Sequence, residues 1–320
     1  MKQIISLLLF FAFVVSATAQ NAPNTIIVDR NGTGHFRTIQ QAIDSVRTYN
    51  PAGTVTIYIK NGFYKEKLII PSHVCYLHIV GEDRDKTIIN YDDHANINKM
   101  GTFKTFTLKI SGNDIVMENL TIENSAAQLG QAVALHLEGD RITFRNCKFL
   151  GNQDTIYAGR ESARQLFENC YIEGTTDFIF GPATAWFEAC TIHCKRNSYI
   201  TAANTPQNVT YGFIFNNCNI TLADSVNAMY LGRPWRAYSM TVFMNCVLPK
   251  GIQLVGWDNW RNPENEKTAR YAEFNNSGEG AITDNRAKWI KILTKKEASK
   301  ITQELVFKRE DSWTPTISKN

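Results

Sequence analysis

The sequence has little of what marks nucleic-acid-binding, membrane-spanning or metal-binding proteins. Its 320 residues carry 34 Lys and Arg against 30 Asp and Glu, a formal net charge of +4 with no dense basic cluster, which argues against a nucleic-acid partner. No long apolar run follows the N-terminal one, so stable membrane insertion is not expected. No Cys or His spacing resembles a metal site, and the Gly-x-Ser-x-Gly elbow of many serine esterases is missing.

The N-terminus has the pattern of a secretory signal peptide. Residues 1–19 hold an early Lys2, an apolar run from Ile4 to Val15, and the small-residue exit Ala17-Thr18-Ala19. The run is short for a membrane span, and no Cys follows it as a lipoprotein would require. We expect cleavage after about Ala19 and a periplasmic or secreted product, with residues 20–320 forming one domain.

A short pattern repeats through the middle of the chain. Five copies begin with Phe and carry Cys at the fourth position, and a sixth, earlier copy lacks the Cys. The spacing of the copies is that of a solenoid whose coils stack through parallel strands, with a bend near the Asn that most copies carry at the third position. The Asn residues should form a hydrogen-bonded ladder. The copies are Met117–Ile122, Phe144–Phe149, Phe167–Ile172, Phe187–Ile192, Phe215–Ile220 and Phe243–Leu248.

Five of the seven cysteines lie in this repeat: Cys147, Cys170, Cys190, Cys218 and Cys246. A column of inward-facing Cys favours small apolar core residues. An exported chain also permits a disulfide between adjacent coils, so this alternative stays open.

Two aspartates share one phase of the repeat. The step from Asp154 to Asp177 equals the step from Phe144 to Phe167, and the same step separates Gln131 from Asp154. Neighbouring strands are ~4.8 Å apart, so the two carboxyl groups should be close enough to raise at least one pKa. Such a pair suits a nucleophile beside a general acid, although aspartates in solenoid turns also have purely structural roles.

Several motifs in order resemble those of the pectinesterase family over nearly all of the chain after its first twenty or so residues. They are Ala132-Val-Ala-Leu135, Gly139-Asp140-Arg141, Gln153-Asp154-Thr155, Asp177-Phe-Ile-Phe-Gly181 and Leu231-Gly232-Arg233-Pro234-Trp235. The resemblance implies an all-β fold, a single-stranded right-handed parallel β-helix with an N-terminal capping helix and a C-terminal helical segment. It also implies a secreted enzyme of bacterial type that demethylates galacturonate methyl esters of pectin, giving pectate and methanol.

The resemblance implies the catalytic roles as well. Asp177 matches the nucleophile, Asp154 the proton donor and later base, and Gln153 the donor to the oxyanion. Arg233 matches the residue that orients Asp177. The phase of the repeat does not place Arg233 beside the aspartates, so its position rests on the resemblance alone.

Substrate contacts are carried over in the same way, to Thr102, Gln131, Arg233 and Trp235. Thr102 is equally an ordinary strand residue. The expected partner is methylesterified homogalacturonan, the protein is expected to be a monomer, and the resemblance implies no cofactor and no metal.

Both ends of the domain should carry helices. Thr38 is expected to cap a helix over 39–46 that covers the open end of the solenoid, and 295–305 has helical spacing. Glu66 is interpreted as a structural anchor. Trp257 and Trp260 could line the groove or cap the core, and the structural role is favoured for both.

Rival functions remain at this stage. A paired Asp also suits a glycosidase, and a pectin lyase can share the solenoid shape. A non-catalytic carbohydrate-binding solenoid is the alternative of another class, although it would not need Asp154, Asp177 and Arg233 together.

Overall fold

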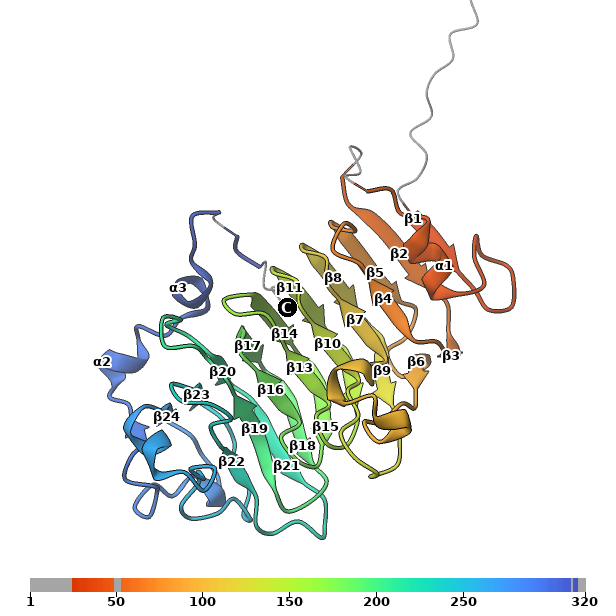
Figure 1. The fold of residues 1–320 in the computed structure, drawn as a ribbon. Coiled ribbons are helices and arrows are strands. Elements are labelled where there is room, and N and C mark those ends of the chain that lie inside the picture. Colours follow the sequence, from red (N-terminus) through yellow and green to blue (C-terminus); the bar gives the residue numbers. More distant parts are fainter. Residues whose placement is uncertain (1–24, 49–52, 312, 316–320) are drawn as a thin grey trace, which may run out of the picture.

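The chain forms three parallel β-sheets wound around one elongated core. In the computed structural model, the described residues are 25–48, 53–311 and 313–315. Successive strands pass from sheet to sheet, and each pairs in parallel with a strand one coil away, which makes a right-handed parallel β-helix (Figure 1). The predicted all-β class is confirmed. The predicted signal peptide, residues 1–19, lies outside the described residues.

In the part of the chain that the structure describes, one sheet has 11 strands and the other two have 7 each. The first sheet contains β1 (Thr25–Val28), β2 (Val55–Ile59), β5 (Leu77–Gly81), β8 (Ile115–Glu118), β11 (Ile142–Arg145), β14 (Arg164–Glu168), β17 (Thr184–Glu188), β20 (Phe213–Asn216), β23 (Met240–Met244), β24 (Arg270–Phe274) and β25 (Lys291–Ile292). The second sheet contains β3 (Gly62–Lys65), β6 (Thr87–Tyr91), β9 (Thr121–Asn124), β12 (Lys148–Leu150), β15 (Tyr171–Gly174), β18 (Thr191–Cys194) and β21 (Asn219–Leu222). The third sheet contains β4 (Leu68–Ile70), β7 (Leu108–Ile110), β10 (Leu135–Leu137), β13 (Ile156–Ala158), β16 (Ile179–Gly181), β19 (Tyr199–Ala203) and β22 (Tyr230–Gly232).

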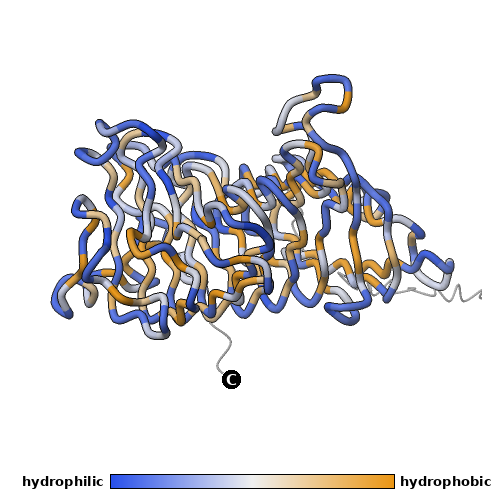
Figure 2. The backbone as a smooth tube through the Cα atoms, turned by 90° about the horizontal axis from the view of Figure 1, so that it is seen from below, coloured by the Kyte–Doolittle hydropathy of each residue, from blue (hydrophilic) through white to orange (hydrophobic). Residues whose placement is uncertain are grey.

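The repeated Phe residues form a column inside the solenoid. Phe144 pairs with Phe167, and each later Phe pairs with the next, so the register is the one that the repeated pattern predicts. Neighbouring rings stack with centroids 5.0, 4.7, 4.4 and 4.4 Å apart along the column. Hydrophobic residues alternate with polar ones along the coils (Figure 2), as strands with one buried face require.

The predicted bend after each Phe strand is present. The third residue of each copy has a left-handed backbone, for example φ 47° at Asn146 and φ 50° at Ala189. Asn tolerates this conformation, which turns the chain from the first sheet into the second. The predicted Asn ladder is only partly formed. Asn146 donates to Asn119 (2.7 Å), but Ala189 interrupts the column and Asn217 donates to Glu188 instead.

The Cys column is a packing feature. All seven cysteines are free, and the five in the repeat are buried, each with its Sγ 3.4–3.6 Å from a carbonyl oxygen of the preceding coil. Burial raises the pKa of Cys147 and Cys190 well above the ordinary thiol value, which keeps these groups as thiols. No disulfide joins the coils that the structure describes, so the interpretation as small core residues holds.

Helices cover the N-terminal end and one face. The Oγ of Thr38 accepts from the Gln41 amide at the start of α1 (Ile39–Asp44), and both oxygens of Glu66 accept from the amides of Ile39 and Gln40, which confirms Glu66 as an anchor. The single helix predicted over 295–305 is wrong. The segment forms α2 (Lys295–Ala298) and α3 (Gln303–Phe307), because the chain leaves the helical conformation after α2 and Thr302 caps a new helix.

Four short 3₁₀ turns complete the described structure: Ile97–Lys99, Thr102–Lys104, Pro263–Lys267 and Glu279–Ala281. The second of these carries Thr102, which is therefore a turn residue rather than a strand residue.

Candidate active site

Every position that the sequence analysis assigned to catalysis or substrate binding lines one cleft on the third sheet. The cleft has a volume of ≈ 270 Å³. Its lining residues are Thr102, Phe103, Gln131, Gln153, Asp154, Asp177, Phe180, Ala202, Arg233, Trp235 and Trp260. These residues come from successive coils, so the cleft crosses the strands rather than following one of them.

The two aspartates lie on adjacent coils, just before β13 and β16. Ile156 pairs with Ile179, which puts Asp154 and Asp177 in register as their common phase in the repeat predicts. Both are almost fully buried, with 8% and 6% of their surface exposed. Both also have left-handed backbones (φ 67° and 49°), a conformation that Asp accepts more readily than most residues.

The surroundings of the two carboxyl groups affect their pKa values differently. Burial raises the pKa of Asp154 well above its ordinary value, and the negative charge of Asp177 raises it further. Burial also raises the pKa of Asp177, but Arg233 opposes this effect with two hydrogen bonds and its positive charge. Because only Asp177 is paired with a cation, the surroundings favour a proton on Asp154 over a proton on Asp177.

Arg233 reaches Asp177 from two coils further along the chain. Its Nε donates to Oδ1 (3.0 Å) and its Nη2 to Oδ2 (2.6 Å), a bidentate pair. The strand that precedes it, β22, approaches its neighbour closely, since a Cβ on Gly232 would lie 2.0 Å from the Thr201 hydroxyl. Two rings also cover the guanidinium, Tyr199 at 3.9 Å and Trp260 at 3.8 Å from their centroids.

The spacing from Gln131 to Asp154 does not match the step between the paired strands of these two coils. Leu135 pairs with Ile156, a shorter step than the one from Gln131 to Asp154, and the Ala132 amide donates to the Gln153 carbonyl oxygen (3.1 Å). Gln131 therefore lies beside Gln153 rather than in phase with Asp154. Both glutamines are half-buried and line the cleft, where their amide groups can serve as donors next to the carboxyl pair.

Aromatic side chains form one wall of the cleft. Phe103, Phe180 and Trp235 line the cleft. The ring of Tyr157, which is not part of the lining, packs between Phe103 and Phe180, so that successive centroids are 4.9, 5.0 and 5.9 Å apart. Such rings offer flat apolar faces to sugar rings. Only Trp235 was predicted. Tyr157 and Phe180 could have been found from the repeat, because each lies three residues after its aspartate and the two are paired in register.

The two tryptophans interpreted as core residues have different positions. Trp257 is buried, packs against Tyr271 with ring centroids 4.5 Å apart and donates its Nε1 proton to Glu273 (2.9 Å), as expected of a core residue. Trp260 lines the cleft and covers Arg233, so the groove-lining alternative holds for it and the favoured structural role is wrong. It stands in an irregular connection after the last repeat copy, where no strand phase indicates which way a side chain points.

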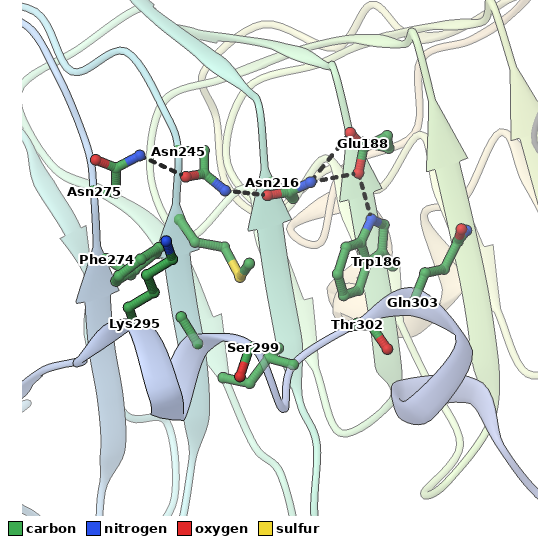
Figure 3. Close-up of a pocket in the computed structure, with 13 residues that line it drawn as sticks. Trp186, Glu188, Asn216, Asn245, Phe274, Asn275, Lys295, Ser299, Thr302 and Gln303 are labelled. Carbon is green, nitrogen blue, oxygen red and sulfur yellow. Dashed lines mark hydrogen bonds between the residues drawn. The ribbon is translucent and has the colours of Figure 1, made fainter.

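A larger cavity of ≈ 750 Å³ lies on the first sheet, under α2 and α3 (Figure 3). Its wall is a chain of hydrogen bonds in which Asn275 donates to Asn245, Asn245 to Asn216, and Asn216 to Glu188. Trp186 donates to the same carboxylate. With its one acidic group already bound by neighbours, this cavity offers no carboxyl pair, and the smaller cleft is the better candidate for chemistry.

No group of three or more His, Cys, Asp or Glu side chains suited to a metal ion occurs in the part of the chain that the structure describes.

Fold and cleft together define a class of protein: a parallel β-helix enzyme with a carboxyl pair in an open, aromatic-lined cleft. Comparison with known proteins narrows this class. The pectinesterase family model matches residues 25–310, and the chain belongs to the pectinesterase family. It is therefore a carboxylic ester hydrolase.

Individual relatives agree with this assignment. Pectinesterase 31 of Arabidopsis thaliana is 36% identical over 282 residues, covering 85% of this chain and 88% of the relative. Pectin methylesterase from carrot has a TM-score of 0.85 and 30% identity, covering 91% of this chain and 94% of that one. A pectin methylesterase in complex with a hexasaccharide has a TM-score of 0.75 and 29% identity, covering 91% and 98%.

Proposed function

We propose that the cleft demethylates pectin with Asp177 as the nucleophile, yielding pectate and methanol. The observation that carries the proposal is the asymmetric carboxyl pair, in which Asp177 is bound in bidentate fashion by Arg233 and Asp154 is not. An ester hydrolase needs one ionised group to attack and one protonated group to release the alcohol. A hexasaccharide bound to a structural relative supports an oligosaccharide as the occupant of the cleft.

In the first half of the reaction, the ionised Asp177 attacks the carbonyl carbon of a galacturonate methyl ester. The amide groups of Gln153 and Gln131 donate hydrogen bonds to the oxyanion that forms. Asp154 gives its proton to the departing methoxy oxygen, so that methanol leaves and an anhydride joins the galacturonate to Asp177.

In the second half, Asp154 acts as the base. It takes a proton from a water molecule, whose oxygen attacks the acyl carbon and breaks the bond to Asp177. The product is a free galacturonate carboxyl group, Asp177 is ionised again, and Asp154 has regained its proton. Thr102, Gln131 and Trp235 hold the sugars beside the reacting ester, and the mechanism uses no metal and no cofactor.

We also propose that the protein acts outside the cytoplasm, as a secreted enzyme of bacterial type. The N-terminal pattern of residues 1–19 supports export with cleavage after about Ala19, to the periplasm or the medium. The substrate is then methylesterified homogalacturonan, and the active unit is a monomer. Among the described residues, no helix is long and apolar enough to cross a membrane.

Methanol release from highly methylated pectin tests the proposal. We expect release by the wild type, none by Asp177→Asn, and no change with EDTA. Asn keeps the size of the side chain and tolerates the left-handed backbone (φ 49°), so that loss of activity reports the carboxylate and not the fold. Asp92→Asn is the matched control, because Asp92 is half-exposed and lies outside the cleft.

Other products would overturn the proposal. Unsaturated or shortened oligogalacturonides without methanol would indicate a lyase or a glycosidase. Pectin binding without any product would indicate a non-catalytic solenoid. Full activity of Asp177→Asn would remove Asp177 from the role of nucleophile.

A further inference from the structure

The Arg233 guanidinium must lie in one plane to bind both oxygens of Asp177. Arginine is a long, flexible side chain, and its free rotamers would present one N–H group as readily as two. In the structure, two rings pack against the guanidinium, Tyr199 with its centroid at 3.9 Å and Trp260 with its centroid at 3.8 Å. These distances are short for cation–π contacts, for which ~6 Å is the outer limit.

Tyr199 belongs to the same column of the solenoid as the aspartates. Ile179 pairs with Thr201 on the next coil, and the Asp177 amide donates to the Tyr199 carbonyl oxygen (2.8 Å). Tyr199 thus follows Asp177 in the column as Asp177 follows Asp154. Its ring in turn stacks on Tyr230, one coil further, with centroids 5.1 Å apart and planes 25° apart.

The stacked rings of Tyr199 and Tyr230 lie next to the backbone of Arg233. Tyr230 begins β22, the strand that leads directly into Arg233, and the Arg233 amide donates to the Thr201 carbonyl oxygen on the strand of Tyr199 (2.9 Å). The ring of Tyr199 therefore forms a floor beside Asp177, and Arg233 extends across it.

The second ring, that of Trp260, comes from a loop that hydrogen bonds hold in place. Its backbone is left-handed (φ 61°), which a bulky residue adopts only when its surroundings hold it there. Its amide donates to the Asp258 carboxylate (2.7 Å), and the Asp258 amide donates to the Gly232 carbonyl oxygen (3.1 Å). The loop that supplies the second ring is thereby fastened to the residue before Arg233.

We propose that Tyr199 is a positioning residue for catalysis, whose ring, together with that of Trp260, holds the Arg233 guanidinium in the plane of the Asp177 carboxylate. The inference rests on the proposed role of Asp177 as nucleophile. The two rings leave 21% of the Arg233 side chain exposed, and its Nε and Nη2 groups donate to the Asp177 carboxylate. Removing the Tyr199 ring allows the guanidinium to tilt. The hydrogen bonds from Arg233 to Asp177 then weaken, and the pKa of Asp177 rises.

The test is the pH dependence of kcat/KM in Tyr199→Leu and Tyr199→Phe. Leu fills part of the space without a π face, whereas Phe keeps the ring and loses only the hydroxyl. We expect Tyr199→Leu to lower kcat about tenfold, equal to about 1.4 kcal/mol, and to move the acidic limb of the profile to higher pH. Tyr199→Phe should stay within about twofold of the wild type with the limb unmoved, and KM for pectin should change less than kcat in both variants.

Several results would overturn the inference. An unmoved acidic limb in Tyr199→Leu would mean that the ring does not control Asp177. An equal loss in Tyr199→Phe would assign the effect to the hydroxyl. A change in KM alone would make Tyr199 a substrate contact. If Tyr199→Leu does not fold, as judged by its guanidinium midpoint, Tyr199→Thr provides the same comparison with a β-branched residue suited to a strand.

Failure of this inference differs from failure of the proposed function. If Asp177→Asn is inactive while the Tyr199 variants behave like the wild type, Asp177 remains the nucleophile and only the positioning role of Tyr199 is refuted. If Asp177→Asn releases methanol, the function itself is wrong.

Discussion

Asp154→Asn should stabilise the protein at neutral pH while it abolishes methanol release. Asp154 is buried beside a second carboxylate, and both circumstances raise its pKa in the folded protein. In the unfolded chain an Asp has a pKa of about 3.9. The folded protein therefore binds a proton that the unfolded chain releases, and the free energy of unfolding falls as the pH rises above this value.

The size of the effect can be bounded in two ways. Keeping the proton on Asp154 at pH 7 costs up to about 4 kcal/mol, because pH 7 lies about 3 units above the unfolded pKa at ~1.4 kcal/mol each. Ionising it instead, at the ~4.8 Å spacing of strands and an effective dielectric constant of about 20, costs roughly 3.5 kcal/mol in repulsion from Asp177. Asn avoids both costs, so we expect a gain of about 3 kcal/mol at pH 7 and under about 1 kcal/mol at pH 4.

Guanidinium unfolding at pH 4 and pH 7 measures this gain. Asp154→Ala is the matched variant, since it removes the same carboxyl but places Ala at φ 67°. Its gain at pH 7 should be smaller by roughly 1–2 kcal/mol, the cost of a left-handed backbone. A gain of equal size at both pH values, or no gain at pH 7, would refute the argument that Asp154 is a buried, proton-binding group.

Three further predictions concern the scaffold. Phe215→Ala should lower the free energy of unfolding by about 3–5 kcal/mol, because its ring is fully buried between two stacked neighbours, whereas Phe63→Ala, at a site 47% exposed, should cost under about 1 kcal/mol in the same guanidinium titration. Iodoacetamide should modify only Cys75 of the native protein, since the other six thiols are buried; two or more modified cysteines in the mass spectrum would contradict the buried column. Glu66→Ala should lower the unfolding free energy by about 1–2 kcal/mol through its two helix-capping bonds (3.0 and 3.1 Å), and a folded variant with reduced kcat would show that Glu66 does more than anchor α1.

The coils could be predicted from sequence because their contacts repeat. The Phe pattern predicted the pairing of Phe144 with Phe167, and from it the register of Asp154 with Asp177. Equal spacing did not indicate equal register for Gln131, whose distance in sequence from Asp154 matches that from Asp154 to Asp177 by accident. The pairing of β10 with β13 advances by a shorter step than the pairing of β13 with β16, and the difference is absorbed in the connections between the strands.

Residues on irregular connections escaped the pattern. Arg233 was placed only through resemblance, since it follows the end of a strand two coils away from Asp177 and its approach depends on the close contact of Gly232 with Thr201. Trp260 escaped for a related reason, because its orientation is set by a left-handed backbone and a bond to Asp258. Tyr199 could have been found, since it follows Asp177 in the column by a single coil step.

Under the proposed mechanism, the column that contains the carboxyl pair also limits where the ester can be hydrolysed. Asp154 and Asp177 are followed on the next coils by Tyr199 and Tyr230, so that within the described coils this column places two acids side by side at one level alone. A linear polymer lying across the strands meets a similar rung about every 4.8 Å. Contacts with the substrate can thus be spread over many coils, while hydrolysis in the proposed mechanism is confined to the carboxyl pair. Coils added at either end would lengthen the substrate-binding surface without adding a second catalytic site.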